Sequence, residues 1–131
     1  MTTISRDRVI RSALWASVVL NALGVIVFLP PALGHPSPLL PIAVPRFFAA
    51  QLGFTIALFG GVYVWLALQS RLNRALVAVG GFGKLGFFAL TALYAFVGDV
   101  PGSMAVNATP DLVLGTVFLW WARTADQRPV R

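Results

Sequence analysis

Apolar residues fill four long stretches of the chain, and short polar or charged segments separate them. The stretches cover about residues 9–29, 47–68, 74–97 and 101–122. A hydrocarbon layer of ~30 Å requires about 20 apolar helical residues to cross it. Because each stretch has about that length, the pattern predicts an all-α integral membrane four-helix bundle, with residues 1–131 forming one four-span domain.

The connection between the first two stretches, residues 30–46, is unusually rich in proline, with six prolines in seventeen residues. Proline lacks a backbone N–H and interrupts regular helices. The sequence therefore predicts that the first helix ends at Pro30-Pro31 and that an irregular loop follows. This loop is long enough to fold as a lid over one end of a bundle.

The fourth stretch contains a second helix-start signal within its apolar run. Thr109 is suited to an N-cap, Pro110 to the first helical position and Asp111 to the first turn. A helix from Pro110 to residue 122 is thirteen residues long, about 20 Å and too short to cross alone. We therefore expect a break near Pro110, which at membrane depth requires burial in protein or a cavity.

Arginines mark one side of the predicted membrane. Basic residues gather on the cytoplasmic side of membrane proteins. Of the nine arginines, only Arg46 falls on one side, and the other eight fall on the opposite side: Arg6, Arg8, Arg11, Arg71, Arg74, Arg123, Arg128 and Arg131. The pattern predicts a multi-pass protein of the cell inner membrane with the N-terminus and the C-terminus both cytoplasmic, in contact with membrane lipids.

Composition agrees with this class and removes several functions. Hydrophobic residues make up 58% of the chain and charged residues 11%, against about 45–50% and 25% in soluble domains. The net charge of +6 lies in clusters between apolar runs, so we expect no nucleic-acid partner. With no cysteine, one histidine and four acidic residues, we expect no metal site, and no motif for a redox cofactor is present.

Three polar residues are predicted near the middle of the membrane. Lys84 lies ten residues from Arg74, Asn21 ten from Arg11, and Asp111 twelve from Arg123, which places them about 15–18 Å from the cytoplasmic rim. Intramembrane charges normally face the bundle interior and pair with one another. We therefore expect a Lys84–Asp111 ion pair with Asn21 hydrogen-bonded to it. Lys84 and Asp111 are the candidate catalytic residues, although a purely structural pair is equally consistent with the sequence.

A second group of polar residues lies nearer the opposite side. Gln51 and Thr55 are four residues apart, and Thr91 and Tyr94 three apart, so each pair shares a helix face. The sequence predicts a ligand cavity in this outer half, above the ion pair. Its candidate substrate-binding residues are Asn21, Gln51, Thr55, Thr91, Tyr94, Asn107 and Arg46.

The layout resembles the small four-helix bacterial membrane proteins called DoxX-like. The shared features are the Pro45-Arg46-Phe47 start of the second span, a polar group in the third span, and glycines in the second and third spans: Gly53, Gly60, Gly61 and Gly80. DoxX-like proteins carry their lysine feature in the first span, whereas Lys84 lies in the third. The resemblance therefore implies a fold type and no function. Small multidrug transporters, which need a membrane-embedded glutamate, are disfavoured because the chain has none.

Three functions stay open on the sequence. The first is binding or transformation of an apolar small molecule (isoprenoid, quinone, sterol-like or fatty) at the Lys84, Asp111 and Asn21 centre, by isomerisation, cyclisation or hydration. Asp111 would act there as acid or base. The second is a structural or assembly subunit of a membrane complex, including a homo-oligomer. The third is a small proton-coupled transporter.

Overall fold

The computed structural model describes residues 3–125. Within this range the chain forms five α-helices and no strand: α1 (Thr3–Ala32), α2 (Arg46–Leu68), α3 (Arg74–Phe96), α4 (Gly102–Asn107) and α5 (Thr109–Thr124). The all-α prediction is confirmed. Arg128 and Arg131 of the predicted topology signal lie outside the described residues.

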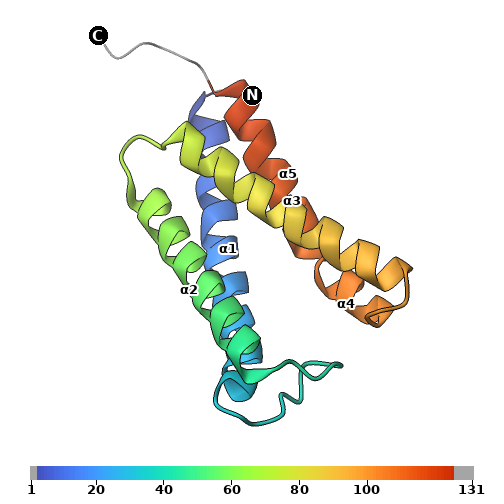
Figure 1. The fold of residues 1–131 in the computed structure, drawn as a ribbon. Helices are drawn as coiled ribbons and strands as arrows, with labels where there is room; N and C mark the ends of the chain where they lie inside the picture. Colours follow the sequence, from blue (N-terminus) through green and yellow to red (C-terminus); the bar gives the residue numbers. More distant parts are fainter. Residues whose placement is uncertain (1–2, 126–131) are drawn as a thin grey trace.

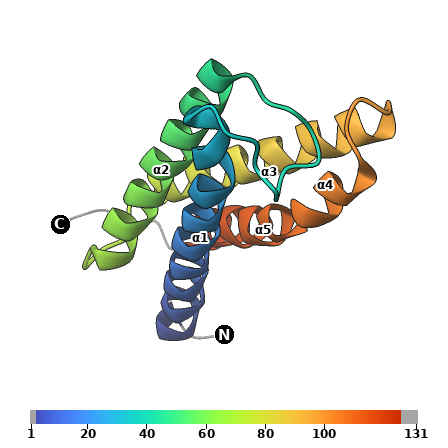
Figure 2. The same ribbon diagram turned by 90° about the horizontal axis from the view of Figure 1, so that it is seen from below.

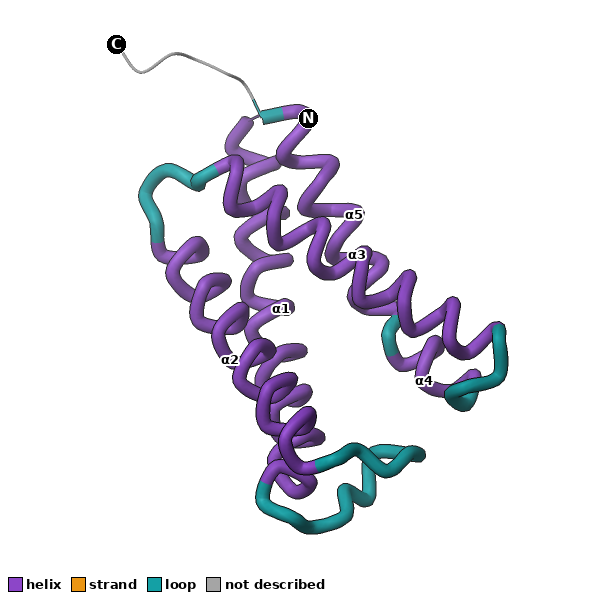
Figure 3. The backbone as a smooth tube through the Cα atoms, viewed as in Figure 1, coloured by secondary structure: helices purple, strands orange, loops and turns teal. Residues whose placement is uncertain are grey.

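The helices form two antiparallel hairpins that pack against each other at one end (Figure 1). α1 packs against α2, and α3 packs against α4 and α5. The hairpins meet at the end where α1 begins and α5 ends, and they diverge towards the other end like the arms of a V (Figures 1 and 3). Seen from the diverging end, the loop between α1 and α2 extends across the space between the arms (Figure 2).

Three helices are long and apolar enough to cross a membrane: Ser5–Ala32, Arg46–Leu68 and Arg74–Phe96. Large apolar side chains are exposed along them, among them Phe54, Phe82 and Phe96. Exposed apolar surface of this extent is unfavourable in water, whereas a bilayer accepts it. The surface thus agrees with the apolar composition.

The hydrophobic core lies where the hairpins meet. Its buried members come from α1, α2, α3 and α5 and include Leu14, Leu66, Val77, Phe118 and Trp121. Ser17 of α1 is also buried, and its hydroxyl donates to the carbonyl oxygen of Ala13 at 2.9 Å. The core fixes the two arms at one end and leaves their other ends free to diverge.

Arginines close the same end by binding the last carbonyl groups of neighbouring helices. Arg11 donates to the carbonyl oxygens of Ala67 and Gln69 at 2.6 and 2.7 Å, where α2 ends. Arg74 donates to the carbonyl oxygen of Ala122 near the end of α5. Such carbonyls have no partner within their own helix. These two arginines therefore join helices as well as carrying the charge that predicts topology.

Glycines bring α3 and α5 into close contact. A Cβ atom added at Gly115 would lie 2.9 Å from Leu85 and 3.0 Å from the carbonyl oxygen of Gly81. A Cβ added at Gly81 would lie 2.9 Å from Leu119. This is the approach of small residues expected between membrane helices. Gly86 has no atom within 4 Å of such a Cβ, so it takes no part in this contact.

Two predicted helix boundaries are wrong. α1 continues through Pro30 and Pro31 to Ala32. Proline accepts helical backbone angles, and here the two residues remove donors only from the last turn. The chain is interrupted between α4 and α5 as predicted, but Ala108 is the N-cap of α5 and no side chain caps it. Thr109 is already helical, and its hydroxyl points back to the carbonyl oxygen of Ala105 at 3.5 Å.

Candidate functional site

The predicted ion pair is present between α3 and α5. Lys84 Nζ lies 2.8 Å from Asp111 Oδ1, and the two side chains are 4% and 15% exposed. Asp111 occupies the first turn of α5, where the partial positive charge of a helix N-terminus favours a carboxylate. The carboxylate therefore offsets two positive groups, the Lys84 ammonium and the start of its own helix.

Tyr63 of α2 adds a third contact to the pair. Its ring centroid lies 5.2 Å from Lys84 Nζ, within the range of a cation–π interaction. The ring is buried, packs edge-on against Phe118, and stands 2.9 Å from the position of a Cβ at Gly80. Tyr63 is not among the candidate site residues predicted from the sequence, since nothing in the sequence shows which way its ring points.

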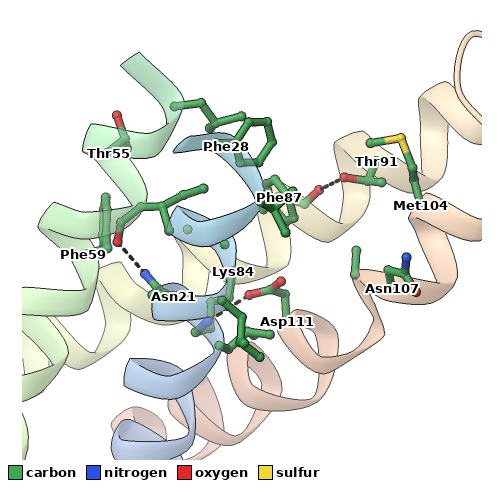
Figure 4. A pocket seen from close by; sticks show the side chains of 18 of the residues that line it. Asn21, Phe28, Thr55, Phe59, Lys84, Phe87, Thr91, Met104, Asn107 and Asp111 are labelled. Carbon is green, nitrogen blue, oxygen red and sulfur yellow. Dashed lines mark hydrogen bonds and ion pairs between the residues drawn. The ribbon is translucent and has the colours of Figure 1, made fainter. Parts of the chain in front are cut away.

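A cavity of about 370 Å³ lies between the diverging hairpins, and the ion pair forms part of its wall. This volume is at the small end of the range of ligand sites, ~300–1,000 Å³. Most lining residues are apolar and come from all five helices, for example Phe28, Phe59 and Phe87 (Figure 4). The arrangement is an apolar chamber with one charged pair at its inner end.

Asn21 lines the cavity but does not bond to the ion pair. Its amide nitrogen donates to the carbonyl oxygen of Ile56 at 2.8 Å, which links α1 to α2 (Figure 4). The predicted hydrogen bond to Lys84 or Asp111 is therefore wrong. Equal depth along three helices does not fix direction, and α1 packs mainly against α2.

The remaining predicted lining residues divide into two groups. Thr55, Thr91 and Asn107 line the cavity. Gln51 and Tyr94 do not; both are exposed, because they lie nearer the ends of the arms, where the hairpins have moved apart.

Arg46, the other predicted binding residue, also lies outside the lining. It is exposed, and its Nε donates to the carbonyl oxygen of Ala32 at 3.1 Å. Arg46 therefore ties the start of α2 to the end of α1. Arg46 is therefore not part of this cavity, and it lines a separate hollow with residues of the proline-rich loop such as His35.

The loop between α1 and α2 contributes residues that sequence analysis did not single out. Leu39, Leu40 and Pro41 line the cavity, which agrees with the predicted lid. The two adjacent leucines are the sequence signal that was available, since they are unusual within a proline-rich loop. Their contact with the cavity closes part of its outer end.

The site offers proton transfer and hydrogen bonding from two side chains. Asp111 can accept hydrogen bonds or exchange a proton, and Lys84 can donate hydrogen bonds. Within residues 3–125 there is no group of three His, Asp or Glu side chains placed to hold a metal ion.

Comparison with protein-family models, with curated proteins and with solved structures finds no match to this chain. The resemblance to DoxX-like proteins therefore stays a prediction from layout.

Proposed function

We propose that this protein is a four-span inner-membrane protein that binds an apolar small molecule, such as an isoprenoid, quinone, sterol-like or fatty molecule. The observation that carries the proposal is the apolar cavity with the Lys84–Asp111 pair in its wall. A predominantly apolar pocket with a few convergent polar groups is the usual form of a ligand site.

The fourth span of the proposed topology combines α4 and α5. α5 alone has 16 residues, about 24 Å, and is too short for a ~30 Å hydrocarbon layer. Residues 102–124 together give about 34 Å. Both termini would then lie in the cytoplasm, with the clustered arginines. Reporter fusions at each end test this topology, and an extracytoplasmic signal at either end would contradict it.

Chemical transformation of the ligand is an extension of binding. Asp111 is placed to take or give a proton at the cavity wall, and Lys84 at 2.8 Å would stabilise its carboxylate or a developing anion. Isomerisation, cyclisation and hydration would each use such a proton transfer, and hydration would also consume a water molecule. Turnover of a bound ligand that is lost in Asp111→Asn would support an enzyme.

A structural role is the second candidate, and one observation favours it. The ion pair joins α3 to α5 beside the glycine contact at Gly81 and Gly115, so it would hold these two helices in register. A buried pair can serve such specificity without acting on a ligand. Proton-coupled transport is the third candidate, and no contact among the described residues favours it over the other two.

A cavity-filling substitution separates ligand binding from a structural role. Gly83 lines the cavity, and a Cβ added there would meet only Phe59, at 3.9 Å. Gly83→Leu should therefore fill part of the chamber without touching the ion pair. Gly86→Leu, three residues further on α3, is the matched control because nothing lies within 4 Å of its Cβ position.

The assay is photolabelling in phosphatidylcholine nanodiscs with a long-chain alcohol that carries a diazirine. Labelled peptides that contain cavity residues should be reduced in Gly83→Leu and unchanged in Gly86→Leu. Equal labelling of cavity peptides in both variants and the parent chain would mean that the probe labels only the lipid-facing surface and does not enter the cavity. The scaffold interpretation would then replace ligand binding.

A further inference from the structure

The cavity contains charge of both signs and a net charge of zero. Among its lining residues, all of which belong to the described part of the chain, only Lys84 and Asp111 carry a formal charge at neutral pH. They lie 2.8 Å apart and compensate each other. A ligand therefore meets a strong dipole rather than a site of one sign.

We propose that the ligand is a neutral, hydroxyl-bearing apolar molecule, an alcohol of isoprenoid, sterol-like or fatty type, and not a fatty acid or an amine. This inference rests on the function proposed above and names its ligand class. It follows from the charge balance of the site and from which hydrogen bonds the site leaves unused.

Charge balance excludes ionised ligands first. A carboxylate in the cavity would leave the site with one net negative charge, and an ammonium group would leave one net positive charge. An uncompensated charge in a low-dielectric interior keeps a large desolvation penalty even after relaxation. A hydroxyl group brings no charge, so it keeps the balance that Lys84 and Asp111 already have.

The hydrogen bonds left unused match a hydroxyl group in both directions. An ammonium group has three donors, and a carboxylate accepts through both oxygens. Within the described residues, Lys84 donates only to Asp111 Oδ1, and Asp111 accepts only from Lys84 through its side chain. A hydroxyl can donate to the second carboxylate oxygen while it accepts from Lys84. A ketone can make only the second of these bonds.

Three of the other polar side chains in the wall donate to backbone carbonyls, whereas Tyr63 and Asn107 also line the cavity and make no side-chain hydrogen bond within the described residues. The hydroxyl of Thr55 donates to Gln51 and that of Thr91 to Phe87, at 2.9 and 2.8 Å. The amide of Asn21 donates to Ile56. Because hydrogen bonds to charged groups are stronger than those to neutral ones, the ligand's polar group is directed to the ion pair. Its apolar part then faces the aromatic wall (Figure 4) and the loop leucines.

A set of competitors with one chain and different head groups tests the inference. Decanol, decanoate and decylamine are each titrated against the diazirine alcohol in neutral phosphatidylcholine nanodiscs at neutral pH. Their concentrations are expressed per lipid after measured partition. Decanol should reduce cavity labelling at a concentration at least about tenfold lower than decanoate or decylamine. The reason is that the free-energy cost of an unpaired charge exceeds ~1.4 kcal/mol, which corresponds to a tenfold change in affinity.

Variants that change the net charge of the site should shift the ligand preference in opposite directions. Asp111→Asn leaves Lys84 as a single cation and should shift the preference from decanol to decanoate. Lys84→Gln leaves a single anion and should shift it to decylamine. A role confined to holding the helices together would not invert preference in opposite directions.

Equal or better competition by decanoate or decylamine in the parent chain would overturn the inference, and so would the absence of competition by decanol. That result needs no variant to fold. It is also distinct from failure of the proposed function, which would appear earlier as labelling that does not respond to Gly83→Leu.

Discussion

Removing one member of the Lys84–Asp111 pair should destabilise the protein more than removing both. At 2.8 Å and an effective dielectric constant of about 20, the attraction between the two charges is about 6 kcal/mol. Desolvation of each ion costs several kcal/mol and offsets most of this gain. The pair is therefore close to neutral in net stability, whereas either charge alone keeps its desolvation cost without the attraction.

The expected values follow from the exposure of each partner. Lys84→Met and Asp111→Leu should each reduce the free energy of unfolding by about 3–5 kcal/mol, and the double variant should lie within about 1 kcal/mol of the parent chain. Asp111→Leu should be the more severe change, because Lys84 is 4% exposed and Asp111 is 15% exposed. The stranded lysine thus has less access to water in the cavity than the stranded aspartate.

Unfolding by steric trapping in bicelles measures these free energies for the four chains of the cycle. Thr116→Val, a change at an exposed position of α5, controls for loss of a polar group on the lipid-facing side. A double variant as unstable as the sum of the two single variants would refute the reasoning. It would mean that the two charges do not compensate each other, and the neutral-site argument for the ligand would fail with it.

Three further changes test the packing around the site by the same measurement. Gly115→Ala should cost about 1–3 kcal/mol, because its methyl group would lie 3.0 Å from a backbone oxygen of α3, whereas Gly86→Ala should be neutral or stabilise by up to about 1 kcal/mol. Asn21→Ala should cost about 1 kcal/mol through its lost bond to α2, and an unchanged stability would show that this bond does not form. Arg11→Gln should cost about 1.5–3 kcal/mol through the loss of its hydrogen bonds to the end of α2. The control is Arg8→Gln, which removes the same charge at an exposed position that has no hydrogen bond among the described residues. Equal losses of stability in the two variants would contradict the structural role of Arg11.

The depth of a residue along its helix could be predicted from the sequence because it depends only on the number of residues from the helix end. Each helical residue advances by ~1.5 Å, so counting from the arginines placed Lys84 and Asp111 at one level. The short turn after α3 indicated that the third and fourth apolar stretches, which carry Lys84 and Asp111, are antiparallel neighbours. Because an unpaired charge inside a membrane is costly, each of the two residues required a partner. These arguments predicted that the two charges pair, and the structure shows the contact, at 2.8 Å.

Directions around each helix could not be predicted in this way. Asn21 has the same depth as the pair, yet it faces α2, because α1 packs mainly against that helix. Tyr63 reaches Lys84 from α2 only because the core at the joined end sets its ring against Phe118. Both contacts depend on the rotation of whole helices, which many side chains decide together.

The sequence by itself therefore determined the helices, the broken fourth segment, the proline-rich loop and the ion pair. Only the tertiary structure decided that the hairpins diverge, that the cavity lies between them and that Leu39 and Leu40 close part of its outer end. It also removed Gln51 and Tyr94 from the cavity. The physical reason is that local sequence fixes rise and apolar length, whereas the angle between hairpins depends on close packing at distant points such as the Gly81–Gly115 contact.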